Sequence, residues 1–149
     1  MRSWLVHHLL AGFVAAGAAC GPTLHTIAYT PQPERIENPA KALAILILAN
    51  TVQGCVTDPV YSNAIFVVKF VCMGGAGNTV LRPDQIASIE LLESAPWYRV
   101  RVRHSRGAED FIWDSKSLDD AQQIADAIQA LAVSAQPAPE QPAPASTKI

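Results

Sequence analysis

The placement of the prolines limits where this chain can fold. The chain has 149 residues and eleven prolines, of which only three interrupt its middle: Pro59, Pro83 and Pro96. The other prolines gather near the two ends, and the C-terminal end is a Gln-Pro-Ala stretch with extended, polyproline-like character. The pattern predicts a tether over residues 20–38, one folded domain over residues 39–133 and a disordered tail over residues 134–149.

The first twenty residues have the order of an export signal. A short positive start, Met1–Ser3, precedes an apolar run over residues 4–19, and Cys20 follows directly. The run contains two histidines and is shorter than the roughly 20 mainly apolar residues that a membrane-spanning helix needs. Residues 1–19 are therefore predicted to be a signal peptide rather than a membrane span.

The stretch Gly17–Gly21 resembles the cleavage region of a bacterial lipoprotein signal. Ala18 and Ala19 match the small residues of that motif and Cys20 matches its lipidated cysteine, whereas Gly17 stands where leucine is usual. The resemblance implies export, a lipid on Cys20 and, with Gly21 following, location at the outer membrane or in the periplasm. The alternative is ordinary cleavage after Ala18 or Ala19, which yields a soluble secreted protein.

Two cysteines, Cys55 and Cys72, remain once Cys20 is set aside. An even remainder in an exported protein favours a disulfide, which adds roughly 3 kcal/mol for a loop of this size. Two buried free thiols that pack as small hydrophobic groups are the alternative. The pair lacks the CxxC spacing of a zinc site, and we expect no metal and no cofactor.

The charge balance argues against nucleic acid as a partner. The chain carries 11 basic and 13 acidic residues, with a net charge of −2. Its pI near 6 is far from the basic value typical of nucleic-acid binding domains.

The domain is predicted to begin with a helix over residues 40–53. Asn38 is a suitable N-cap, Pro39 fits the first helical position, and Gly54 is a plausible stop. The segment is apolar on nearly all sides, so we expect it to be buried or to face a partner. Its β-branched residues leave a buried strand as the rival interpretation.

Strands and a second helix are predicted to follow. Residues 73–78 are rich in glycine and are interpreted as a turn. Ser117 is a predicted N-cap for an amphipathic helix that runs to about residue 132. β-branched and aromatic residues predict the strands, which cover residues 64–72, 79–81 with 86–92, 97–104 and 108–113.

This order of elements predicts an α+β fold, with a small antiparallel sheet or partial barrel, a buried N-terminal helix and a C-terminal amphipathic helix. The second half resembles pleckstrin-homology-like domains, in which a meander of strands ends in a capping helix. The resemblance covers about a third of the chain, and it implies binding of a lipid, peptide or protein without catalytic residues. The stretches that carry it are residues 86–91, 98–102, 111–113 and 117–131.

Four arginines are candidate anion-binding residues. A period of two places Arg99, Arg101 and Arg103 on one face of a strand, and Arg106 follows in the next turn. Guanidinium groups suit phosphate and carboxylate, so the face fits lipid headgroups, polyanionic glycans or an acidic partner. The alternative is a solvated sheet face whose charge is balanced by neighbouring acids such as Glu90.

Motifs of known enzymes are absent from the sequence. It holds no GxSxG and no HExxH, and the glycine stretch at residues 74–79 lacks the lysine of a phosphate loop. We therefore expect a non-catalytic cell-envelope lipoprotein, with a binding or scaffolding domain at a membrane surface. One alternative is an accessory subunit of an envelope complex, in which the helix over residues 40–53 packs on a partner protein. The other is a small secreted hydrolase with an unfamiliar constellation, which a deep pocket gathering His104 with acids and a hydroxyl would favour.

Overall fold

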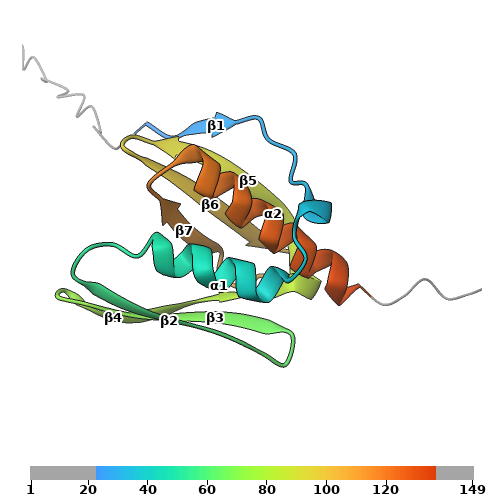
Figure 1. Cartoon of the computed structure of the whole chain (residues 1–149), viewed down its shortest axis with the longest axis horizontal. Coiled ribbons are helices and arrows are strands. Elements are labelled where there is room, and N and C mark those ends of the chain that lie inside the picture. The colour runs from blue at the N-terminus through green and yellow to red at the C-terminus, as the bar shows by residue number, and fades with distance from the viewer. Residues whose placement is uncertain (1–22, 137–149) are drawn as a thin grey trace, which may run out of the picture.

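The computed structural model describes residues 23–136, which form two antiparallel sheets and two long helices (Figure 1). Sheet A has the strand order β1-β5-β6-β7 and sheet B has the order β2-β3-β4. The helices and antiparallel sheets make the fold α+β, as predicted. Within these residues there are two sheets, which do not close into a barrel, where the sequence predicts one small sheet or a partial barrel. The elements are β1 (His25–Ile27), η1 (Pro33–Arg35), α1 (Pro39–Ala49), β2 (Cys55–Ser62), β3 (Ile65–Cys72), β4 (Gly75–Leu81), η2 (Pro83–Gln85), β5 (Ile86–Ser94), β6 (Trp97–His104), β7 (Phe111–Ser115) and α2 (Leu118–Ala135).

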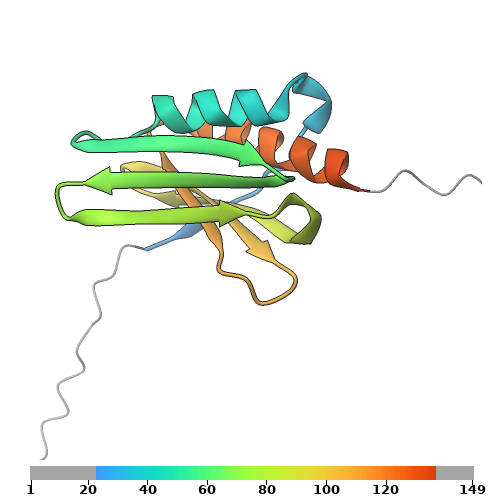
Figure 2. The ribbon, with the colours of Figure 1, turned by 90° about the horizontal axis from the view of Figure 1, so that it is seen from below.

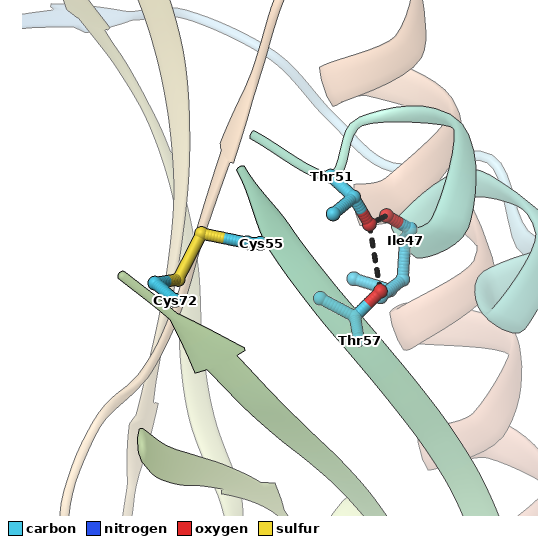
Figure 3. Close-up of a disulfide and its surroundings, with 5 residues drawn as sticks. All are labelled: Ile47, Thr51, Cys55, Thr57 and Cys72. Atoms are coloured by element: carbon cyan, nitrogen blue, oxygen red, sulfur yellow. Dashed lines mark hydrogen bonds between the residues drawn. A yellow bond between two sulfur atoms is a disulfide. The ribbon is translucent and has the colours of Figure 1, made fainter. Parts of the chain in front are cut away.

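Helix α1 begins where the sequence predicts and ends earlier. The Asn38 side chain accepts a 3.2 Å hydrogen bond from the Lys41 N–H, which confirms the N-cap. The helix ends at Ala49, four residues before the predicted end. The Thr51 hydroxyl bonds the Ile47 carbonyl and the Thr57 hydroxyl of β2, and this turns the chain toward sheet B (Figure 3).

Helix α1, which the sequence predicts to be buried or to face a partner, is buried on one side only. Leu43 and Ile47 are fully buried, whereas Ile45 is 56% exposed and Leu48 is 51% exposed. Only the side of α1 that contacts α2 and β2 is covered, because no other element of residues 23–136 packs against the helix closely. The second helix is covered on more sides.

Helix α2 is the central element of the core. The Ser117 hydroxyl accepts a 3.1 Å hydrogen bond from the Asp120 N–H, which confirms the predicted N-cap. Nine of its residues are buried because it packs against sheet A, α1 and the N-terminal segment together. None of the helices of residues 23–136 is long and apolar enough to cross a membrane.

The segment predicted to be a tether contributes to the folded domain. Residues 25–27 form β1, which pairs antiparallel with β5. The Tyr29 hydroxyl and the Gln32 N–H each donate a 2.7 Å hydrogen bond to Asp126 of α2. Ordered structure therefore begins well before residue 39, because the edge of β5 and the side of α2 both accept this segment.

Sheet B differs most from the sequence prediction. Strand β2 was not predicted, and β4 includes residues 75–78, which the glycine content marked as turn. Pairing with β3 along its length holds this glycine-rich segment extended, and only Met73 and Gly74 separate the two strands. Strand β7 also lies later than predicted, at Phe111–Ser115.

The two ends of the described chain lie at opposite ends of the molecule. Both views show the start of β1 at the same end as the β3–β4 hairpin, and the end of α2 at the other (Figures 1 and 2). One apolar core joins both helices and both sheets, with its largest fully buried side chains at Phe66, Phe111, Leu43, Ile47, Leu81, Ile124, Ile128 and Leu131.

Candidate functional site

The outer side of sheet B is an apolar surface, which we call the valine face. Strand register places nine residues of β2, β3 and β4 on it in three rows. The two outer rows are apolar and the middle row is polar. The rows are Val60–Val67–Val80, Asp58–Lys69–Asn78 and Val56–Val71–Ala76.

Three of the five valines of this face are open to solvent. Val56 is 73% exposed, Val71 is 59% exposed and Val60 is 42% exposed. Figure 2 views sheet B from this side, with its three strands in front of sheet A, and Figure 1 shows α1 on the other side of the sheet. An exposed apolar patch of this kind marks an interaction surface more often than a single exposed hydrophobic residue does.

The opposite side of sheet B belongs to the core. Phe66, Val68 and Leu81 alternate with the valine face along their strands and are fully buried or nearly so. A sheet with one solvated side normally shows polar residues there. Sheet B instead carries β-branched residues on both sides, which is the pattern of a sheet covered on both sides.

The middle row gives the valine face its charge pattern. Asp58 of β2 lies directly opposite Lys69 of β3, and Lys69 lies opposite Asn78 of β4. All three residues are exposed. The face therefore carries one negative and one positive group on adjacent strands, with apolar rows on each side.

A disulfide joins the ends of β2 and β3. Cys55 and Cys72 lie opposite each other in the register, with an S–S distance of 2.00 Å and a Cα–Cα distance of 4.1 Å (Figure 3). The bond links the strand that follows α1 to the β3–β4 hairpin. It holds the Val56 and Val71 row of the valine face in register at this end of the sheet.

A cavity of about 300 Å³ lies beside the disulfide. Its lining combines apolar groups from both sheets with the Thr57 hydroxyl and the Asp114 carboxylate. The Trp113 indole nitrogen is buried and, among residues 23–136, is the only buried side-chain polar atom without a hydrogen-bond partner. The cavity is a lesser candidate site, because its lining is mainly apolar and offers few groups that could orient a ligand.

Most of the predicted arginine cluster is engaged in ion pairs within sheet A. Arg99 makes two hydrogen bonds to Asp114, at 2.6 and 2.8 Å, and this bond raises the pKa of Arg99. Arg101 bonds Glu90, and Arg103 lies 3.4 Å from the same carboxylate. Arg106 lies apart in the β6–β7 loop and is exposed. The arrangement matches the charge-balanced alternative, and an anion at this face would compete with existing partners.

His104 is bound by main-chain groups on both sides of its ring. Its Nε2 accepts from the Arg82 N–H at 3.1 Å, and its Nδ1 lies 2.9 Å from the Glu109 carbonyl. These partners fix the neutral tautomer with the proton on Nδ1. The ring joins the end of β4 to the β6–β7 loop, and both of its nitrogens have main-chain partners.

The predicted lipidation residue Cys20, the predicted signal over residues 1–19 and most of the predicted tail over residues 134–149 lie outside the described residues. Among residues 23–136, no three His, Cys, Asp or Glu side chains gather as a metal site would require. Comparison of the chain with protein-family models, with curated proteins and with solved structures found no match.

The valine face was not predicted from the sequence, although one part of its signal was visible. The residues from 65 to 72 are apolar at both odd and even positions, which is unusual for a strand with one solvated side. Strand β2 and most of β4 were not recognised, so the three rows were not assembled. Recognition of the face depends on the register of three strands.

Proposed function

We propose that this chain is a non-catalytic lipoprotein of the bacterial cell envelope whose domain acts as a binding or scaffolding module at a membrane surface. The outer membrane or the periplasm is the proposed location, with the lipid on Cys20 as the anchor. The binding surface is the valine face. The two antiparallel sheets with a C-terminal helix also support a pleckstrin-homology-like module, a class that binds partners without catalysing a reaction.

The exposed valine face is the observation that carries the proposal. Exposed apolar rows on a sheet face favour a binding role, because their contact with water costs free energy and promotes association. Val56, Val60 and Val71 lie on a sheet that is ordered by its own hydrogen bonds and by a disulfide, so the face is present before any partner binds. A preformed surface of this kind suits a scaffold.

The disulfide supports the proposed compartment. Disulfides form and persist in the periplasm and outside the cell, whereas the bacterial cytosol keeps thiols reduced. A bond between Cys55 and Cys72 is therefore compatible with export.

The anchor is tested by intact mass and fractionation. We expect the full chain, produced in a Gram-negative bacterium, to yield a membrane-bound product that begins at Cys20 and carries the mass of acyl chains. The variant Cys20→Ser should lose both the acyl mass and the membrane fraction. A product found in the cytosol with Met1 in place would overturn the proposal.

The binding surface is tested by accessibility in the envelope. A cysteine at position 60, made by Val60→Cys, should react slowly with a thiol reagent in intact envelopes and quickly after mild detergent extraction. The matched control, Glu37→Cys, is exposed on another surface and should react at the same rate in both samples. Equal reactivity of position 60 in the two samples would show that nothing covers the valine face.

An accessory subunit of an envelope complex is a second candidate, which the outer side of α1 favours. Ile45 and Leu48 are about half exposed on a helix that is otherwise packed into the domain. A stoichiometric protein that copurifies in mild detergent, and that is lost in the variant Ile45→Glu/Leu48→Glu, would establish this alternative.

A further inference from the structure

We propose that the valine face is a self-association surface, and that two copies of this chain pack face to face about a two-fold axis that runs parallel to the strands between β2 and β3. The inference rests on the proposed function, because it names the partner of the same face. Two features of the chain indicate that the partner is a second copy: the charge pattern of the face and the position of the chain start.

The charge pattern is complementary to itself about this axis. A rotation of 180° about it places β2 of one copy over β3 of the other and keeps the three rows aligned. Asp58 of each copy then faces Lys69 of the other, and valine faces valine in both outer rows for these strands. Each copy thus supplies the aspartate of one ion pair and the lysine of the other, as an isologous interface requires.

Other two-fold axes in the plane of the face do not give this match. An axis along β3 would place Lys69 against Lys69, and an axis between β3 and β4 would place Lys69 against Asn78. An axis perpendicular to the strands through the middle row would place Asp58 against Asp58. Juxtaposed like charges at an interface cost several kcal/mol, so the charges select the axis between β2 and β3.

The start of the described chain supports the same axis independently. A two-fold axis parallel to the strands leaves both copies pointing in the same direction along the strands. The start of β1 lies at the end of the molecule that holds the β3–β4 hairpin, so both copies present it at one end (Figures 1 and 2). Two lipid-anchored copies can then share one membrane. A perpendicular axis would place the two anchors at opposite ends.

The geometry of sheet packing tolerates this arrangement. Two twisted sheets pack about 10 Å apart with their strands at about −30° to each other. The strands of the two sheets cross near the centre of the contact, and Asp58 and Lys69 form the middle row there. The ion pairs therefore lie where the crossing strands diverge least. Interfacial ion pairs of this kind fix register and partner more than they add affinity.

The expected dimer is weak in solution and favoured on a membrane. Only β2 and β3 of each copy cover each other about this axis, and two strands over three rows span roughly 200 Å² by strand spacing, well below the roughly 800 Å² per partner of a standard interface. We therefore expect dissociation constants between the micromolar and millimolar ranges. Anchoring two copies in one bilayer raises their effective concentration and compensates for the small contact.

Charge reversal with mixing tests the interface. The full chain, purified in density-matched mild detergent, should dimerise reversibly in sedimentation experiments as its concentration rises from micromolar to millimolar. The variants Asp58→Lys and Lys69→Asp should each self-associate at least about tenfold more weakly, because like charges then meet across the axis. An equimolar mixture should restore association, since the two lysines in the middle row of one variant then face the two aspartates of the other.

The mixture separates an interface from a folding defect. Each variant places like charges opposite each other within its own sheet, and mixing leaves this intramolecular cost unchanged. Glu37→Lys, with the charge change of Asp58→Lys on another surface, should dimerise as the wild type does. A wild type that stays monomeric at millimolar concentration, variants that dimerise normally, or a mixture that stays monomeric would each overturn the inference. If the cysteine of Val60→Cys were still protected from the thiol reagent in envelopes, the valine face would remain a binding surface. Its partner would then be something other than a second copy of this chain.

Discussion

The Tyr29 hydroxyl donates a 2.7 Å hydrogen bond to the carboxylate of Asp126, a residue 97 positions later in the chain. The Gln32 N–H donates to the same carboxylate oxygen at 2.7 Å. Asp126 is only 3% exposed, so it is a buried charged group that both donors compensate. This contact holds the N-terminal segment on α2.

We expect Tyr29→Phe to lower the free energy of unfolding by about 1–2 kcal/mol, as for a partly buried hydrogen bond to a charged group. Asp126→Ala should cost more, because it also leaves the Gln32 N–H without its acceptor. Chemical denaturation measures both values. Tyr61→Phe, at a residue that is 43% exposed, is the control and should change stability little. Equal losses for Tyr29→Phe and Tyr61→Phe would contradict the assignment.

Stability should fall at alkaline pH through Tyr29. Burial and the hydrogen bond to Asp126 raise the pKa of Tyr29 from 10.0 to about 12. The folded state therefore holds the proton more tightly than the unfolded state, and this contribution is complete below pH 10 and is lost as pH rises to about 12. The difference in unfolding free energy between wild type and Tyr29→Phe should be constant below pH 10 and shrink above it. A difference that does not change with pH would refute the prediction.

Loss of the disulfide should destabilise the domain by roughly 3 kcal/mol, since the bond closes a loop in the unfolded chain between cysteines that are 17 positions apart. The double variant Cys55→Ala/Cys72→Ala provides the test by thermal or chemical denaturation. Addition of a reductant should lower the melting temperature of the wild type and leave that of the double variant unchanged. Identical responses of the two proteins would show that the bond does not form.

The substitution Gly77→Ala should destabilise sheet B. A Cβ atom at position 77 would lie 2.7 Å from the tip of the Phe70 ring, so the ring must move. We expect a cost of about 1–3 kcal/mol, as for overpacking in a core. Gly74→Ala, where nothing lies within 4 Å of the added atom, is the control. In a double-mutant cycle with Phe70→Leu, the cost of Gly77→Ala should decrease, and an unchanged cost would argue against the contact.

The buried side chain of Asn50 should contribute strongly to stability. Its carbonyl oxygen accepts from the Ser115 hydroxyl and the Lys116 N–H, both at 3.0 Å, and its amide donates to the Leu46 carbonyl and to Asp120. Asn50→Ala leaves several of these buried groups unpaired, so we expect a loss of about 3 kcal/mol or more. Asn38→Ala removes only a helix cap and should cost about 1 kcal/mol. Urea denaturation measures the loss of stability in both variants. Similar losses for Asn50→Ala and Asn38→Ala would contradict the prediction.

Local signals explain which elements the sequence predicts. The starts of α1 and α2 were predicted because Asn38 and Ser117 bond N–H groups within their own first turns. Strand β6 was predicted because its residues alternate between the core and the arginine face, with Val100 and Val102 fully buried. In each case the residues that decide the structure are neighbours in the sequence.

Elements that depend on distant partners were missed. Strand β1 is held by β5, and the glycine-rich part of β4 is held by β3, so neither has a local pattern that reveals it. The ion pair between Glu90 and Arg101 follows from adjacent strands of one hairpin and was anticipated. The valine face can be recognised only when the register of three strands is known, so it was not predicted.

The pairing of β1 with β5 also sets how far a lipidated chain could stand off from a bilayer. Five residue steps separate Cys20 from His25, and an extended chain covers at most about 3.6 Å per residue, so the anchor would lie within roughly 18 Å of the first paired strand. Met73, which is 98% exposed, lies in the hairpin at that same end (Figure 1). In an anchored chain, the end of the domain that holds the start of β1 and the β3–β4 hairpin would therefore stay close to the bilayer, and the end of α2 would lie at the other end of the domain.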